Sequence, residues 1–342
     1  MKKNGFTLLE LLLSVGIFTI ILAIIAQLST TTLKSWRRVS DRQTQFAEAK
    51  IAFDSIQARL SQAELNPYWG FEFGSGTNNS PTSYKRLSDL HFVTGESSEL
   101  TTQNHFSHAV FFHGAFGISR EEELSQFGSL INSWGYFVDF GNSNDADVLD
   151  GQNVQDRFRF RLMELQVDAE DVSTFQTDME DENQLDLNEF TDRNMIYKWF
   201  REPIADDQAY VLAENVIALI ISPLPRTIDG VAFDETTLAP DYLYDTREFQ
   251  YSNVENLPSE HQLPPILRIT MVVISEGSAF QLADGNGSNP PSIGIDNLFS
   301  SLANYESDLE VLKQTLNSQN IDFRIFSNTI KMRNSRWTEI QE

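Results

Sequence analysis

Three histidines lie close together in the first half of the chain and could bind a metal ion. They are His105, His108 and His113, and the last two fall in an aromatic-rich segment that predicts a strand. Side chains alternate between the two faces of a strand, so His108 and His113 should point to opposite faces. The chain contains no cysteine, and the spacing matches no zinc motif. We therefore interpret these residues as ordinary strand histidines.

Two acidic turns offer the oxygen ligands that calcium prefers. One contains Asp145, Asp147 and Asp150, and the other contains Asp284 and Asn286. Neither has the closing glutamate of an EF-hand, and Asp, Asn and Gly favour turns without any metal. A solvated turn is the simpler interpretation. Calcium stays open as the single candidate cofactor.

The common catalytic motifs are missing from the sequence. It has no Gly-x-Ser-x-Gly elbow, no Walker loop, no dinucleotide-binding glycine pattern and no His-Glu-x-x-His. Carboxylates are so numerous that no pair stands out as an acid and a base. We therefore predict that the protein is not an enzyme and has no catalytic residue.

The N-terminus carries the clearest chemical signal. Lys2 and Lys3 precede Gly5, and an apolar run then extends from Phe6 to Leu28 with Glu10 as its one charged residue. This length suits a membrane span of roughly 20 residues, and the lysines favour a cytoplasmic N-terminus. A carboxylate inside an apolar helix costs about 2.5–3.5 kcal/mol on insertion scales, so Glu10 is expected to have a partner or a function.

Two ordinary interpretations of this N-terminus fit less well. A cleaved secretory signal peptide would have a shorter apolar core and a small-residue site after it, but Ser29–Lys34 is not such a site. A plain signal anchor would leave Glu10 unexplained.

The run Lys-Lys-Asn-Gly-Phe-Thr-Leu-Leu-Glu resembles the prepilin processing site of type IV pilins and pseudopilins. The resemblance implies cleavage between Gly5 and Phe6 by a membrane prepilin peptidase, which would also N-methylate Phe6. It further implies that Glu10 pairs with the freed amine of a neighbouring subunit. The implied partners are the peptidase, other pilins or pseudopilins and an inner-membrane assembly platform, with the globular part outside the cytoplasm.

The size of the chain suggests a large minor subunit, and the expected order of its elements resembles that of the large minor pseudopilins of the J or W type. Three later segments also resemble the prepilin-like "Verru_Chthon cassette protein C" family; they are Ala213–Leu219, Leu263–Val272 and Asp322–Phe326. The implied function is a structural or tip-initiating subunit of a type IV pilus or type II secretion pseudopilus. The alternative is a membrane-anchored surface binding module, a tip adhesin or substrate receptor that uses loops 168–192 and 223–265.

The elements that position these residues follow from hydrophobic periodicity. We expect a leader at 1–5, a transmembrane helix at 6–28, its extracytoplasmic continuation at 29–65 and a globular domain at 66–342. Phe46, Ala49, Phe53, Ile56 and Leu60 have helical spacing and should bury one face of the continuation. A second amphipathic helix is predicted over Asp296–Leu316. The class is α+β, with the long helix against a mainly antiparallel sheet.

Strands are predicted from β-branched and aromatic runs. They are Ser107–Ile118, Trp134–Phe140, Arg157–Val167, Val216–Ile221, Ile266–Ile274 and Phe323–Met332, the last with a bulge near Ser327. In Arg157–Val167 the arginines alternate with apolar residues and should face solvent. Polar loops at 74–83, 168–192, 223–265 and 283–292 should be exposed.

The chain has a formal net charge of −24 from 342 residues. Nucleic-acid binding relies on lysine and arginine to neutralise phosphates, so nucleic acid is not an expected partner. The same charge favours a soluble, self-repelling surface domain.

Overall fold

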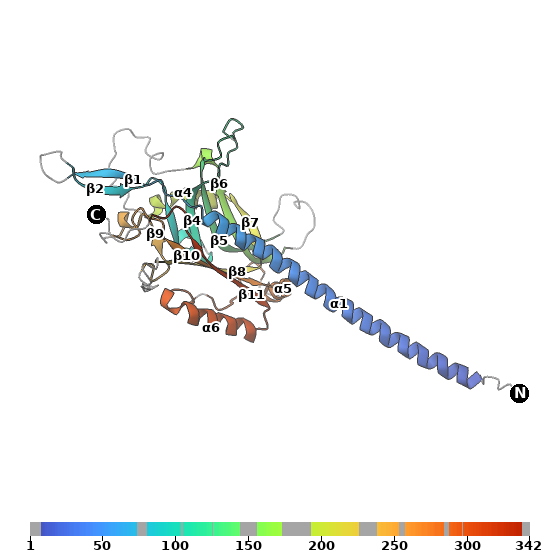
Figure 1. Cartoon of the computed structure of the whole chain (residues 1–342). Coiled ribbons are helices and arrows are strands. Elements are labelled where there is room, and N and C mark those ends of the chain that lie inside the picture. The colour runs from blue at the N-terminus through green and yellow to red at the C-terminus, as the bar shows by residue number, and fades with distance from the viewer. Residues whose placement is uncertain are drawn as a thin grey trace. The chain divides into compact units, whose positions relative to one another are not determined.

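The computed structural model describes residues 8–73, 81–103, 105–124, 126–143, 156–172, 193–225, 238–252, 257–283, 287–295 and 297–336. Contacts divide the chain into two units, Met1–Ala47 and Glu48–Glu342. Within the described residues the class is α+β, as predicted, with a long N-terminal helix followed by a mainly antiparallel sheet domain (Figure 1).

The first element, α1, is one continuous helix over Leu8–Leu60. Its last turns belong to the globular unit. There Ala49, Phe53, Ile56 and Leu60 are buried, which confirms the predicted apolar stripe at these four positions; Phe46, before them, is half-buried. The helix ends at Leu60 rather than Leu65, because Ala63 pairs with Gly114 and the Glu64 N–H donates to the His113 carbonyl at 2.8 Å.

A six-stranded antiparallel sheet forms the centre of the globular unit. Its order is β7-β6-β5-β4-β3-β9. The strands are β7 (Ala209–Glu214), β6 (Phe158–Val167), β5 (Ile131–Asn142), β4 (Phe106–Ala115), β3 (Phe92–Glu96) and β9 (Tyr244–Asp245). One face packs against the short helices α2 (Ser97–Thr101), α3 (Arg193–Ile196) and α4 (Lys198–Ala205).

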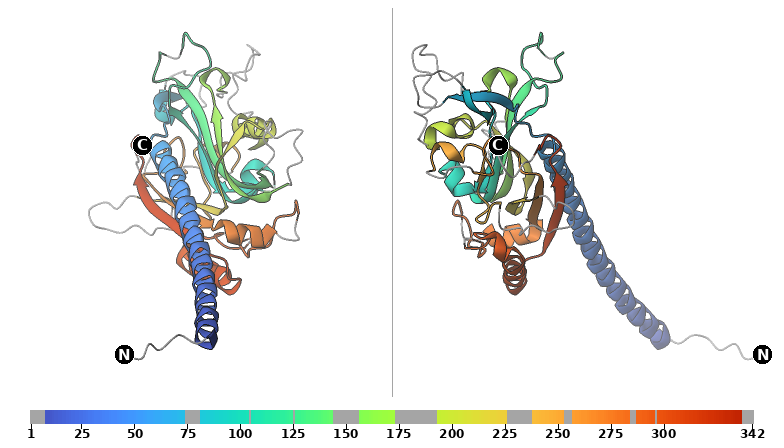
Figure 2. Two further views of the ribbon diagram at one scale, coloured as in Figure 1. Left: turned by 90° about the vertical axis from the view of Figure 1, so that its right-hand side faces the viewer. Right: turned by 60° about the vertical axis from the view of Figure 1, so that its left-hand side comes forward.

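A three-stranded antiparallel sheet lies against the other face (Figure 2). Its order is β11 (Phe323–Lys331), β10 (Ile266–Ile274) and β8 (Val216–Leu224), and β8 contacts β4, β5 and β6. The helices α5 (Glu276–Ala283) and α6 (Tyr305–Ser318) belong to this half. Among the described residues, short 3₁₀ turns at Ala169–Asp171, Glu248–Gln250 and Leu302–Asn304 join the elements.

A separate two-stranded ribbon follows α1. It consists of β1 (Tyr68–Phe73) and β2 (Pro81–Leu87), paired antiparallel, and it projects from the rest of the globular unit in Figure 1. Neither strand was predicted from the sequence. The glycine- and serine-rich residues between them indicated an exposed loop, and the short flanking runs were not recognised as strands.

Several predictions about local structure were wrong. Strands β10 and β11 pair in one unbroken register from Ile266–Lys331 to Ile274–Phe323, so there is no bulge at Ser327. The hydroxyl of Ser327 instead lies 2.8 Å from that of Thr270, which allows a polar side chain on this face. The late helix begins at Tyr305, because a 3₁₀ turn and an extended Ser301 precede it.

The segment 223–265 is not an exposed loop throughout. Tyr244 and Asp245 form edge strand β9, and Tyr242, Thr246 and Arg247 are also buried. Arg159 is another exception, because it is 3% exposed although the alternation predicted a solvent-facing side chain. Its guanidinium bonds Glu276 at 2.6 and 3.0 Å, and this pairing makes burial possible.

The core beneath α4 depends on one close contact between a ring and a glycine. Phe111 of β4 stacks on Phe200 of α4, with ring centroids 4.0 Å apart and planes at 6°. The Phe111 ring also covers Gly135 of β5, where an added Cβ would lie 2.2 Å from a ring carbon. Only glycine leaves room for this arrangement.

Buried histidines connect the central strand β4 to the layers on its two faces. His108 donates from Nε2 to the Phe299 carbonyl at 3.0 Å and accepts from the Ile221 N–H at 3.3 Å. His113 packs on Trp199, with ring centroids 4.2 Å apart. The two side chains therefore point to opposite faces, as predicted. Burial lowers the pKa of His108 to about 4 and that of His113 to about 3.

Gly135→Ala should destabilise the globular unit by about 1–3 kcal/mol, because the new methyl group must displace Phe111 from its stack on Phe200. Urea unfolding of the full-length protein in detergent, followed by near-ultraviolet circular dichroism, measures this change. Gly277→Ala is the matched control, since nothing lies within 4 Å of its added Cβ and Ala favours the α5 helix. Equal midpoints for both variants would contradict the packing account.

Acidification should destabilise the fold between pH 6.5 and about 4, because the unfolded chain binds protons that buried His108 and His113 cannot accept. Each histidine contributes stability that is complete above its unfolded pKa. This contribution falls by about 1.4 kcal/mol per pH unit as the pH drops toward the folded value. The free energy of unfolding of His108→Gln should fall less per pH unit than that of the wild type, when both are measured from pH 7 to 4.5. An unchanged slope would show that His108 does not take part.

Candidate functional site: an exposed apolar helix with one carboxylate

The segment Leu8–Leu33 of α1 is long and apolar enough to cross a membrane. At about 1.5 Å per residue its 26 residues exceed the roughly 30 Å of a bilayer core. None of the side chains in this segment is buried, and the large apolar ones are 47–79% exposed. A surface of this kind must be covered by lipid or by other proteins.

Five hydroxyl groups in this segment donate to carbonyls of the helix itself. Ser14 donates to the Leu11 carbonyl at 2.9 Å, and Thr19 donates to the Gly16 carbonyl at 2.8 Å. Thr30, Thr31 and Thr32 donate in the same way to carbonyls three or four residues back. Because these bonds need no water, the polar residues are compatible with an apolar surrounding.

Glu10 is an exposed residue in the first described turn of α1. It is the single charged residue between Leu8 and Leu33 in the sequence. The predicted processing residues Gly5 and Phe6 and the leader lysines Lys2 and Lys3 lie outside the described residues. The site therefore consists, where it is described, of a carboxylate at one end of a bare apolar helix.

A second candidate is a buried His–Asp pair of the type that many hydrolases use. His91 Nε2 lies 2.6 Å from Asp245 Oδ1, and the two residues are 1% and 0% exposed. Asp245 also accepts from the hydroxyls of Tyr197 and Tyr251 at 2.8 Å each. The second nitrogen of His91 accepts from Trp199 Nε1 at 3.0 Å, so it is not available as a general base.

The charge state of this pair agrees with a structural role. Burial lowers the pKa of His91 despite the adjacent carboxylate. Burial alone would raise the pKa of Asp245, but His91 and the hydrogen bonds hold it below its usual range. A neutral imidazole thus donates to an ionised, fully bonded carboxylate, and the network ties β3, β9 and α4 together. Sequence reasoning missed it because the two residues are 154 positions apart.

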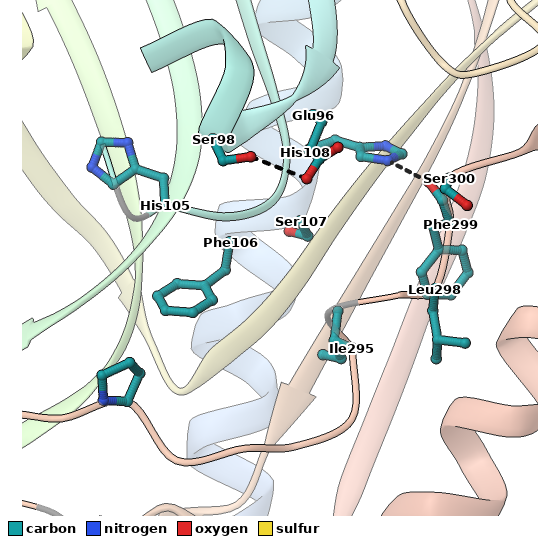
Figure 3. A pocket seen from close by; sticks show the side chains of 11 residues that line it. Glu96, Ser98, His105, Phe106, Ser107, His108, Ile295, Leu298, Phe299 and Ser300 are labelled. Carbon is teal, nitrogen blue, oxygen red and sulfur yellow. Dashed lines mark hydrogen bonds between the residues drawn. The ribbon is translucent and has the colours of Figure 1, made fainter. Parts of the chain in front are cut away.

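A third candidate is a surface pocket of about 320 Å³ at the start of β4 (Figure 3). His105 and His108 line it together with Glu96 and Ser98 and the segment around Phe299. Figure 3 shows the Ser98 hydroxyl directed at Glu96 and His108 directed at the Phe299 carbonyl. The hydrogen bond from Ser98 to Glu96 is 3.0 Å long. The serine therefore pairs with a carboxylate and not with a histidine, which gives no activated nucleophile.

Metal ligation finds no support in the part of the chain that the structure describes. It contains no group of three or more His, Asp or Glu side chains able to hold an ion. His105 Nδ1 lies 2.8 Å from the Thr101 hydroxyl, and His108 is bonded to the backbone. The calcium candidates Asp145, Asp147, Asp150, Asp284 and Asn286 lie outside the described residues.

Comparison with known protein families identifies the N-terminal segment. A family model described as the prokaryotic N-terminal methylation motif matches residues 1–26. The comparisons give no matching curated protein and no matching solved structure. The match covers Gly5, Phe6, Glu10 and most of the exposed apolar helix. Residues 1–26 of this chain are therefore an N-terminal methylation motif, the class III signal peptide of type IV pilins and pseudopilins.

Proposed function

We propose that this protein is a minor subunit of a type IV pilus or type II secretion pseudopilus, with a structural or tip-initiating role. The methylation motif indicates a pilin-like or pseudopilin subunit. The observation that carries the proposal is the bare apolar surface of Leu8–Leu33 with its single carboxylate. Membrane lipid covers that surface before assembly, and the helices of neighbouring subunits cover it afterwards.

Processing would create a positive charge at the amine of Phe6, which would pair with Glu10 of a neighbouring subunit. Prepilin peptidase would cut between Gly5 and Phe6, remove Lys2 and Lys3 and methylate the new amine of Phe6. In an apolar surrounding, a carboxylate and an ammonium group are each costly alone but compensate one another as a pair. Pairing between neighbouring subunits would thus favour assembly in one axial register.

The proposed location is the bacterial inner membrane, with one span, a cytoplasmic N-terminus and the globular unit outside. An assembly platform in the same membrane would pass the subunit into the filament. No catalytic role is proposed, since the motif is that of structural subunits and the His–Asp pair is fully bonded. Calcium binding at the two acidic turns stays a proposal without support from described residues.

Glu10→Gln should insert and be processed normally but enter filaments at least tenfold less, because it removes the charge while keeping the shape. Quantitative mass spectrometry of sheared filaments and of membranes from the native host measures the ratio. Ser14→Ala, one helical turn further along α1, is the matched control and should assemble normally. Normal incorporation of Glu10→Gln would disprove charge pairing, and loss of Phe6 methylation would indicate a processing defect instead.

A photo-crosslinking residue at Ile51 should capture other proteins that carry N-methylated, prepilin-type termini. Ile51 is 70% exposed on α1, beside the buried stripe, so a label there disturbs no core contact. The same label at Val311 of α6, which is 47% exposed, is the control and should capture a different or smaller set. An uncut Met1 terminus with no prepilin-type partner would contradict the filament proposal and leave a plain membrane anchor.

A further inference from the structure

The ribbon β1–β2 exposes a row of aromatic rings on one face. Trp69 lies opposite Arg86, and Phe71 lies opposite Tyr84. Residues directly opposite in an antiparallel pair share a face, so all four side chains are on the same side. Trp69, Phe71 and Tyr84 are 59%, 56% and 62% exposed. Exposed rings in such number on a short ribbon indicate a binding surface.

Contacts within the row keep the rings in fixed positions. The rings of Phe71 and Tyr84 have centroids 5.2 Å apart, and the Arg86 guanidinium lies 5.7 Å from the centre of the Trp69 ring. Trp69 and Phe71 are two residues apart on one strand and so are spaced by about 7 Å. The row is thus a preformed platform, so ligand binding costs little side-chain conformational entropy.

A pocket of about 300 Å³ continues this platform at the base of the ribbon. Its walls come from three distant segments. They include Tyr68, Trp69 and Arg86 of the ribbon, Gln262, and Asn334 with Arg336.

Hydrogen bonds hold the other two walls in place. The Gln262 carbonyl accepts from the Tyr244 hydroxyl at 2.8 Å. Asn334 Nδ2 donates to the Ala63 carbonyl at 3.1 Å, and the Ser335 hydroxyl donates to the Leu263 carbonyl at 3.0 Å. The pocket walls are therefore joined to the core of the globular unit.

The described residues that line this pocket carry a charge opposite to that of the chain as a whole. The sequence has 49 acidic and 25 basic residues, yet the described residues that line the pocket include two arginines and no carboxylate. Burial lowers the pKa of Arg86, which places its guanidinium partly inside the pocket wall. Guanidinium groups bind carboxylates through two parallel hydrogen bonds, which favours a planar anion.

We propose that the pocket and the aromatic row bind an acidic polysaccharide, a chain of sugar rings that carry carboxylates. The apolar faces of successive rings would lie on Trp69 and Phe71, Arg86 and Arg336 would bind the carboxylate, and the exposed Asn334 would accept from a hydroxyl through Oδ1. A peptide C-terminus carries its carboxylate at one end only, whereas an acidic polysaccharide repeats ring and charge along a platform that continues beyond the pocket. This inference does not depend on filament assembly.

The test is calorimetric titration of the full-length protein in detergent with trigalacturonic acid, a trimer of carboxylate-bearing sugars. Binding should be saturable, should weaken as salt is raised, and should be at least tenfold weaker for the neutral galactose trimer. Arg86→Gln and Trp69→Ala should each weaken binding of the acidic trimer at least tenfold. A thermal melt of each variant checks that it folds. If Trp69→Ala does not fold, the result for Arg86→Gln alone decides the test.

Two matched control variants separate this site from general effects of charge and aromatic surface. Arg324→Gln removes another exposed arginine beside an aromatic ring, and Tyr210→Ala removes another exposed ring at 65% exposure. Both should bind the acidic trimer as the wild type does.

Absence of saturable binding, or equal binding by Arg86→Gln, would overturn the proposal. Preference for a peptide with a free C-terminal carboxylate over the acidic trimer would also overturn it and would indicate a protein partner. Filament incorporation of Arg86→Gln, measured in the same host, shows whether the subunit role stands independently.

Discussion

The apolar surface of α1 is the constraint on which the biology of this chain depends. Each large apolar side chain gains about 1.5–3 kcal/mol when it is fully buried, so the side chains of Leu8–Leu33 together represent tens of kcal/mol. In the same helix, Ala49, Phe53, Ile56 and Leu60 obtain that burial from the chain's own globular unit. In one part of the helix the apolar side chains are therefore buried by the chain's own globular unit. In the other part they can be buried only by lipid or by other proteins.

The β-rich unit is held together largely from its middle strand. Phe111 and His113 of β4 reach the layer of α4, while His108 reaches β8 and the segment at Phe299. His108 is bonded at both ring nitrogens and His113 at Nδ1, and such bonds reduce the cost of burying a polar side chain in a core. Their chemistry resembles that of an active site, but each nitrogen of His91 and of His108 is occupied by the fold itself.

The sequence predicted those features that depend on local pattern. The membrane-type helix, the buried stripe and the bounds Ile266–Ile274 of β10 all follow from hydrophobic periodicity and β-branched runs. Sequence reasoning failed where distant partners decide the outcome. Arg159 is buried because Glu276 lies beside it, and Asp245 became part of a core because His91 and Tyr197 meet it there. No window around these residues contains that information.

The end of α1 is fixed from two sides. The Glu64 N–H bonds to the His113 carbonyl, while the Arg333 N–H bonds to the Ser61 carbonyl and Asn334 bonds to the Ala63 carbonyl. The last turn of the helix, the end of β4 and the residues after β11 thus form one cooperative unit, although they are far apart in the sequence. In hydrogen exchange their amides should therefore open together. A pulling force applied through α1 would have to break these hydrogen bonds together and would not unwind the helix end one residue at a time.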